Sequence, residues 1–217
     1  MNYVGVDLHQ KTSWFYEVDS CGNKLDSRNV PNTEEDLKDY FGKIPKPFTL
    51  AVESTCNWYF FVDLAQQYAE EVFLANSYEL KAFAKRHKKT DKIDARLIAN
   101  VLHKGFLPAV TIADKQTRQI REIIRYRINI VRDRSRNVSR LKALLDKVGC
   151  HYSGDFTTYK GLRRIDTEGL PLIHVYLISR YGEQIIELGQ RIHDIEKQIL
   201  HITEKDIDIE LTHQKPI

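Results

Sequence analysis

Residues 3–18 read YVGVDLHQKTSWFYEV, and they contain two short runs, 3–7 and 13–18, that are rich in β-branched and aromatic side chains. Runs of this kind, separated by a few polar residues, are typical of β-strands. The turn signal Ser-Cys-Gly-Asn follows at 20–23, and residues 24–30 can return as a third strand. The start of the chain therefore predicts an antiparallel three-stranded meander.

Beyond the meander, helical and strand-like patterns alternate. A helix start is indicated at Thr33, because acidic residues follow it where the helix dipole favours them. Thr90 can cap a later helix in the same way. The expected elements are a helix from 34 to about 42, strand 48–53, helix 58–70, strand 72–75, a helical pattern to about His87, and helix 91–103. This order, βββαβαβα, predicts an α/β fold with a mixed sheet and flanking helices.

Length and composition narrow the class of protein. A chain of 217 residues with 42% hydrophobic and 29% charged residues is typical of one or two globular domains. No apolar run approaches the roughly 18 residues of a membrane span, and no secretory signal begins the chain. The three Cys lie far apart without a CxxC pair, which favours a reducing cytoplasm over a disulfide framework or a zinc site.

The modest net charge of +3 hides an uneven distribution. Residues 1–80 carry a net charge of −7, residues 81–147 carry +13, and residues 148–217 carry −3. A concentrated basic block indicates a polyanionic partner such as nucleic acid. A solvated helical face is the alternative interpretation of the same charges.

Much of the basic block falls in a stretch from 114 to 148 that contains no Pro or Gly and has helical periodicity. One side of the predicted helix is apolar and the opposite side is rich in arginine, while Arg127 and Arg134 fall on the apolar side. The apolar side comprises Ile120, Ile123, Ile124, Val131, Val138, Leu141 and Leu145, and the arginine stripe comprises Arg118, Arg121, Arg125, Arg132, Arg136 and Arg140.

Residues 149–170 contain four glycines and are interpreted as a loop or hinge, after which a heptad pattern begins. Isoleucine, leucine and tyrosine recur at alternating spacings of 3 and 4 from Ile178 to Ile202, which predicts a coiled coil that can support a dimer or higher homo-oligomer. A bundle helix facing a core is the alternative. The expected domains are a core at 1–108, a long basic amphipathic helix within 109–150, and a hinge with the coiled coil at 151–217.

Four acidic residues form the candidate catalytic and metal site. Asp7 and Glu53 each close a predicted strand, and Asp91 and Asp94 are spaced i, i+3 on one helix face. Like charges at that spacing repel, and divalent cations such as Mg²⁺ are held by a few carboxylates together with water and phosphate. Four carboxylates can hold two metals for phosphodiester chemistry. The alternatives are a helix-start role for Asp91 and a surface role for Asp94.

The motifs VGVDLHQKT (4–12), AVEST (51–55) and KKTDKIDARLIA (88–99) carry a family resemblance. The chain resembles the DEDD-type insertion-sequence transposases, which include bridge-RNA-guided recombinases, over residues 1 to about 150. The resemblance implies an RNase H-like (RuvC-like) fold and Mg²⁺ or Mn²⁺ bound by Asp7, Glu53, Asp91 and Asp94. It also implies DNA and a structured guide RNA as partners, in the transposition of an insertion sequence. His9 and Lys11 match the same first-strand motif and can approach the site.

Two departures from the family pattern bear on function. Ser54-Thr55-Cys56-Asn57 replaces an expected glycine-containing turn, and the family's C-terminal domain, with its proposed serine nucleophile, would begin about where this sequence ends at Ile217. We therefore expect the N-terminal part of a transposase, incomplete for strand exchange. The alternatives are a resolvase-like metal-dependent endonuclease and a non-catalytic RNA-binding oligomerisation module.

The resemblance gives the basic block a role. Basic residues flank the proposed metal site, and the arginine stripe spans roughly 33 Å at 1.5 Å per residue, enough to follow a duplex backbone. The expected nucleic-acid-binding residues are Lys85, Arg86, Lys88, Lys89, Lys92, Arg118, Arg121, Arg125, Arg132, Arg136 and Arg140.

Overall fold

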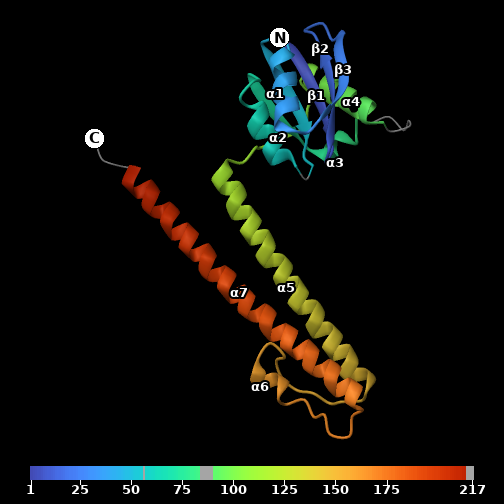
Figure 1. Ribbon diagram of the computed structural model, residues 1–217, viewed down its shortest axis with the longest axis vertical. Helices are drawn as coiled ribbons and strands as arrows, with labels where there is room; N and C mark the ends of the chain where they lie inside the picture. Colours follow the sequence, from blue (N-terminus) through green and yellow to red (C-terminus); the bar gives the residue numbers. More distant parts are fainter. Residues whose placement is uncertain (56, 84–89, 214–217) are drawn as a thin grey trace. The chain divides into compact units, whose positions relative to one another are not determined.

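The structure is a computed structural model, and it describes residues 1–55, 57–83 and 90–213 (Figure 1). The chain divides into two compact units, Met1–Ile112 and Ala113–Ile217. The three-part division expected from the sequence stays a prediction.

The first unit is built on a six-stranded sheet with the order β3-β2-β1-β4-β5-β6. Its strands are β1 (Asn2–Leu8), β2 (Thr12–Val18), β3 (Lys24–Pro31), β4 (Phe48–Glu53), β5 (Glu71–Ala75) and β6 (Ala109–Val110). The pairs β1–β2 and β2–β3 are antiparallel, whereas β4 is parallel to both β1 and β5. The expected meander and the mixed α/β sheet are confirmed, and only the two-residue β6 had no sequence signal.

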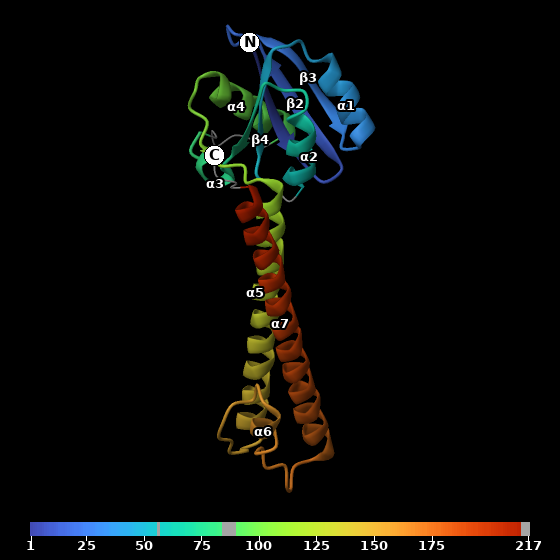
Figure 2. The same ribbon diagram turned by 90° about the vertical axis from the view of Figure 1, so that its left-hand side faces the viewer.

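Helices cover both faces of this sheet (Figure 2). α1 (Glu34–Lys43) and α2 (Trp58–Ala65) pack on one face, against alternate residues of β1 and β4. α4 (Asp91–His103) packs on the opposite face, and the short α3 (Ser77–Leu80) follows β5. The helical pattern expected up to His87 is confirmed only as α3, and residues 84–89 lie outside the described part of the chain. α2 also ends at Ala65, earlier than expected.

The second unit is an antiparallel pair of long helices, α5 (Lys115–Lys147) and α7 (Leu172–His213), joined by a segment that contains α6 (Tyr159–Leu162). The expected heptad seam is buried by α5 of the same chain. The contact is made by two apolar clusters, one containing Leu141, Leu145, Ile178 and Ile185 and the other Ile130, Ile192 and Ile195. Supercoiling and self-association of this pair stay predictions.

Two details of this unit differ from expectation. Ile124, placed on the apolar side of the helix, is 40% exposed, because α7 covers only a narrow seam of α5. Residues 149–170 are more than a hinge, since Phe156 and Ile165 from this segment are buried against the helix pair. Arg127 does lie on the α7 side as expected, and it forms an ion pair with Glu196.

Among the described residues, no helix combines the length and apolarity needed to cross a membrane.

Candidate metal centre

The alternation of β1 places Asp7 on the face of the sheet that carries α4. Val4, Val6 and Leu8 point into the core beneath α1 and α2, so Gly5 and Asp7 point the other way. In β4 the same alternation directs Glu53 to the α4 face. β1 and β4 are parallel and in register up to Val6 opposite Val52, so Asp7 and Glu53 are the next residues along neighbouring strands. Two carboxylates therefore meet at one edge of the sheet.

Close helix packing brings the other two acids to this edge. A Cβ atom at Gly5 would lie 2.2 Å from the backbone N of Ala99 and 2.3 Å from the carbonyl O of Ala95, so α4 touches the backbone of β1 directly. Ala95 and Ala99 are fully buried in this contact. Asp91 begins the helix, and Asp94 follows three residues later, still in the first turn of α4. The glycine and the two alanines thus set how near these carboxylates come to Asp7.

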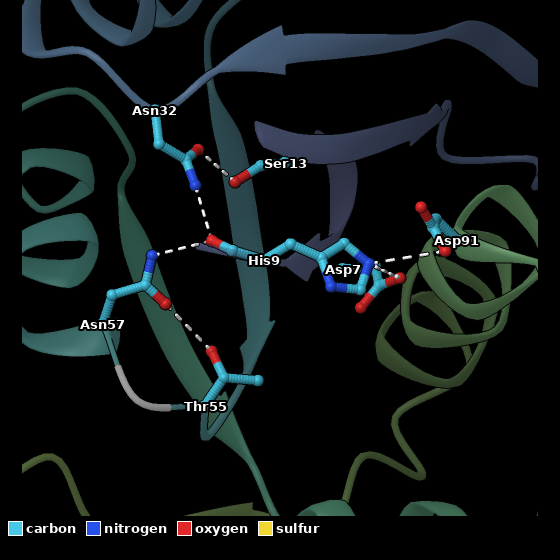
Figure 3. A network of polar contacts seen from close by, with 7 residues as sticks. All are labelled: Asp7, His9, Ser13, Asn32, Thr55, Asn57 and Asp91. Carbon is cyan, nitrogen blue, oxygen red and sulfur yellow. Dashed lines mark hydrogen bonds and ion pairs between the residues drawn. The ribbon is translucent and has the colours of Figure 1, made fainter. Parts of the chain in front are cut away.

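Asp7, His9 and Asp91 form a close group of polar side chains (Figure 3). His9 Nε2 lies 3.1 Å from Asp7 Oδ2 and 3.4 Å from Asp91 Oδ1. One ligand atom from each of the three residues lies within 4.8 Å of the others, a spacing that one metal ion can bridge. Asp7 is buried, while His9 and Asp91 remain about half exposed. The site is therefore open to solvent on one side.

Burial and neighbouring charges raise the pKa of Asp7. Loss of solvent is the largest cause, and the negative charges of Asp94, Asp91 and Glu53 add to it, while His9 acts in the opposite direction. The pKa rises from its ordinary value of 3.8 to about 6. A carboxylate that is costly to ionise in this position favours a cation beside it.

Glu53 and Asp94 lie next to this group. Both acids line one cavity with Ser77, Leu80 and Lys81. Among the described residues, they are not part of the close group of ligand atoms formed by Asp7, His9 and Asp91. They nevertheless act on the charge of Asp7. The structure thus gathers all four predicted acids at one edge of the sheet, with Asp7 and Asp91 joined through His9. The shared binding of metal by all four stays a prediction.

The predicted nucleic-acid residues divide into three sets. Lys85, Arg86, Lys88 and Lys89 lie outside the described residues. Lys92, Arg121, Arg125, Arg132, Arg136 and Arg140 are exposed. Arg118 differs from the rest of the stripe, because only 5% of its surface is exposed, and its part in binding stays a prediction. Arg125 and Arg136 also pair within α5, with Glu122 at 2.7 Å and Asp133 at 3.0 Å.

Comparison with known proteins shows to which family the chain belongs. The family model described as DEDD_Tnp_IS110, Transposase, matches residues 4–149. The chain belongs to this transposase family. The matched residues include most of β1, all of β4 and α4, and with them all four acids of the candidate site. The family resemblance inferred from the sequence motifs is confirmed.

Other proteins are similar to this IS110-family chain over different lengths. The transposase for insertion sequence element IS1328 of Yersinia enterocolitica is 23% identical over 197 residues, which cover 90% of this chain. The chain spans 58% of that relative's length. Among solved structures, T. thermophilus RuvC in complex with a Holliday junction substrate aligns with 51% of this chain and 99% of its own, at 10% identity and a TM-score of 0.34.

His9 of this IS110-family chain was expected only to approach the site, and it lies between two of the acids. The signal available was its position, two residues after Asp7 in the motif VGVDLHQKT. Asn32 and Asn57 had no signal at all, and both donate hydrogen bonds to the backbone carbonyl of His9. These two residues come from separate loops, so only the folded chain brings them together.

Proposed function

We propose that this chain is the N-terminal part of a DNA transposase that binds a divalent metal at the Asp7 edge of the sheet and binds nucleic acid through its arginine-rich helix. The convergence of Asp7, His9 and Asp91 carries the proposal, because it brings ligand atoms within bridging distance in a chain of the transposase family. The metal ligands we propose are Asp7, Glu53, Asp91 and Asp94, and they are also the proposed catalytic residues.

The residues present fit Mg²⁺ or Mn²⁺. Both ions accept carboxylate oxygens and water, and Asp7 contributes a carboxylate whose ionisation is opposed by burial and by three like charges. A bound cation removes that cost. When bound, a divalent ion supplies charge stabilisation at a phosphodiester and lowers the pKa of an attacking water or hydroxyl. The chain's own part is to hold Asp7 rigidly in β1 while α4 presents Asp91 and Asp94 from the exposed side.

A calorimetric titration with Mn²⁺ tests the metal proposal. We expect Asp94→Asn to weaken Mn²⁺ binding by about tenfold or more, because a charge that acts on Asp7 is lost. Glu35→Gln is the matched control, since Glu35 is an exposed acid on α1, on the opposite face of the sheet. An Asp94→Asn chain with unaltered Mn²⁺ affinity would count against the proposed four-acid site.

The nucleic-acid proposal rests on the exposed arginines of α5. DNA and a structured guide RNA are the proposed partners, and contacts to their phosphates weaken steeply with salt. We expect the double variant Arg125→Ala, Arg132→Ala to lower the salt slope of DNA binding by up to about 2 in a mobility-shift assay. Arg180→Ala on α7 is the control, because Arg180 is an exposed arginine outside the stripe. An unaltered slope in the double variant would oppose the proposal.

Self-association remains part of the proposal. The heptad seam of α7 is already occupied by α5 of the same chain, so a dimer or higher oligomer would use other surfaces. Light scattering of the purified chain across concentration tests it, with a constant monomer mass as the opposing result.

A further inference from the structure

The backbone at His9 is held by three hydrogen bonds at the turn that follows β1. Figure 3 shows the two that its carbonyl oxygen accepts. Its carbonyl oxygen accepts from Asn32 Nδ2 at 2.7 Å and from Asn57 Nδ2 at 2.8 Å. Its N–H donates to the carbonyl of Thr12 at 3.1 Å. These three bonds hold the backbone groups on both sides of the His9 Cα atom, and they come from β2 and from two separate loops. They restrict where the imidazole can lie.

The two asparagines are themselves oriented. Ser13 Oγ donates to Asn32 Oδ1 at 2.5 Å, and Ser13 is fully buried. Thr55 Oγ1 donates to Asn57 Oδ1 at 3.3 Å. In each amide the oxygen is occupied by a hydroxyl, so the nitrogen is directed to the His9 carbonyl. The amides therefore form an outer layer of support around the histidine.

The position of the imidazole matches that of a metal ligand. A nitrogen and an oxygen bound to one ion at about 2.1 Å lie about 3.0 Å apart at a right angle and about 3.4 Å apart at a tetrahedral angle. His9 Nε2 lies 3.1 Å from Asp7 Oδ2 and 3.4 Å from Asp91 Oδ1. The same spacing therefore allows a single ion to be bound by all three side chains with little rearrangement.

We propose that His9 Nε2 is a nitrogen ligand of the metal held by Asp7 and Asp91, and that Asn32 and Asn57 are positioning residues for it. This inference rests on the proposed metal-binding function and goes beyond its four carboxylates. Imidazole favours ions such as Co²⁺ over Mg²⁺, which prefers oxygen. His9 thus makes the site a mixed nitrogen and oxygen site and sets its preference among ions.

The test compares Co²⁺ and Mg²⁺ binding to the full chain after metal is stripped. Calorimetry gives both affinities, and the visible absorption of bound Co²⁺ reports its ligands. We expect His9→Ala to weaken Co²⁺ binding by about tenfold or more and to change the absorption, while Mg²⁺ affinity falls by less than about threefold. Asn32→Ala and Asn57→Ala should weaken Co²⁺ binding by about tenfold and leave the absorption bands in place, because the ligand remains but is less well held. His193→Ala, an exposed histidine on α7, is the control for non-specific binding.

The possible results distinguish a failure of the His9 inference from a failure of the proposed metal-binding function. Loss of both metals in Asp7→Asn together with selective Co²⁺ loss in His9→Ala supports the inference. Equal Co²⁺ affinity in His9→Ala and the wild-type chain overturns it, and so does an equal loss of both metals. A gain in affinity also overturns it, because His9 would then compete with the ion for the carboxylates. Metal binding that survives Asp7→Asn contradicts the proposed function itself. If an asparagine variant fails to fold, judged by its urea transition, His9→Ala decides the question alone.

Discussion

Replacing Asp7 by asparagine should stabilise the metal-free protein. The folded chain holds a proton on Asp7 up to a pH of about 6, whereas the ordinary pKa, expected in the unfolded chain, is 3.8. As the pH rises from about 4 to about 6, ionisation of Asp7 therefore favours the unfolded state. The difference between the two pKa values corresponds to about 3 kcal/mol of lost stability above pH 7. Asparagine has nearly the same size and carries no charge, so the variant avoids this loss.

The first unit carries an optical probe for the experiment. The chain has two tryptophans, Trp14 in β2 and Trp58 in α2, and both belong to the sheet unit. Their fluorescence during urea unfolding thus follows this unit and not the helix pair. In EDTA at pH 7.5 we expect Asp7→Asn to unfold at higher urea, with a gain of about 1–3 kcal/mol. At pH 4 the gain should nearly vanish.

Saturating Mn²⁺ should reverse the order, because ligand that binds only the folded state stabilises it and the variant has lost a ligand. Glu35→Gln, exposed on the opposite face, should follow the wild-type chain throughout. A lower stability of Asp7→Asn than of the wild-type chain in EDTA at pH 7.5 would show that burial of the Asp7 charge does not cost stability. A stability difference that does not vary between pH 4 and 8 would show the same.

Three further changes test the packing inside each unit, two in the sheet unit and one in the helix pair. Gly5→Ala should destabilise the sheet unit by about 1–3 kcal/mol or more in urea unfolding and weaken Mn²⁺ binding, because the new Cβ would lie 2.2 Å from Ala99 N. A variant with wild-type stability would show that α4 can move freely. Tyr40→Phe should lower the free energy of unfolding by about 1–3 kcal/mol in the same assay, because the Tyr40 hydroxyl donates to the buried carboxylate of Glu17. Unaltered stability would mean that this hydrogen bond does not stabilise the fold. Arg127 and Glu196 should show a coupling of about 0.5–1 kcal/mol in the free energy of unfolding, measured on the single and double alanine variants by circular dichroism of the helices. If the two single effects simply add, the ion pair does not stabilise the contact of α5 with α7.

The sheet and the positions of its acids were open to prediction because both follow short-range rules. Alternation along 3–7 and 48–53 directs Asp7 and Glu53 to one face, and the i, i+3 spacing directs Asp91 and Asp94 to one side of a helix. The approach of α4 to β1 was not predictable in this way. It depends on Gly5 meeting Ala95 and Ala99, a match between residues about 90 apart that no local pattern records.

The same limit applies to the support of His9 and to the long helices. Asn32 and Asn57 are ordinary loop residues until folding places both amides on one carbonyl. The heptad seam was visible from spacing, but its partner was not, because any apolar helix could cover it. The apolar side was also predicted only in part. Ile124 is exposed, whereas Ile130, which was not assigned to that side, packs on α7, and the polar Asn137 is buried.

Anomalous diffraction from crystals of the chain soaked in Mn²⁺ would show directly whether a metal binds between Asp7 and Asp91. We expect a manganese peak within about 2.5 Å of carboxylate oxygens of both Asp7 and Asp91, at the edge of the sheet. The absence of such a peak at saturating Mn²⁺, or a peak held only by residues elsewhere in the chain, would contradict this expectation.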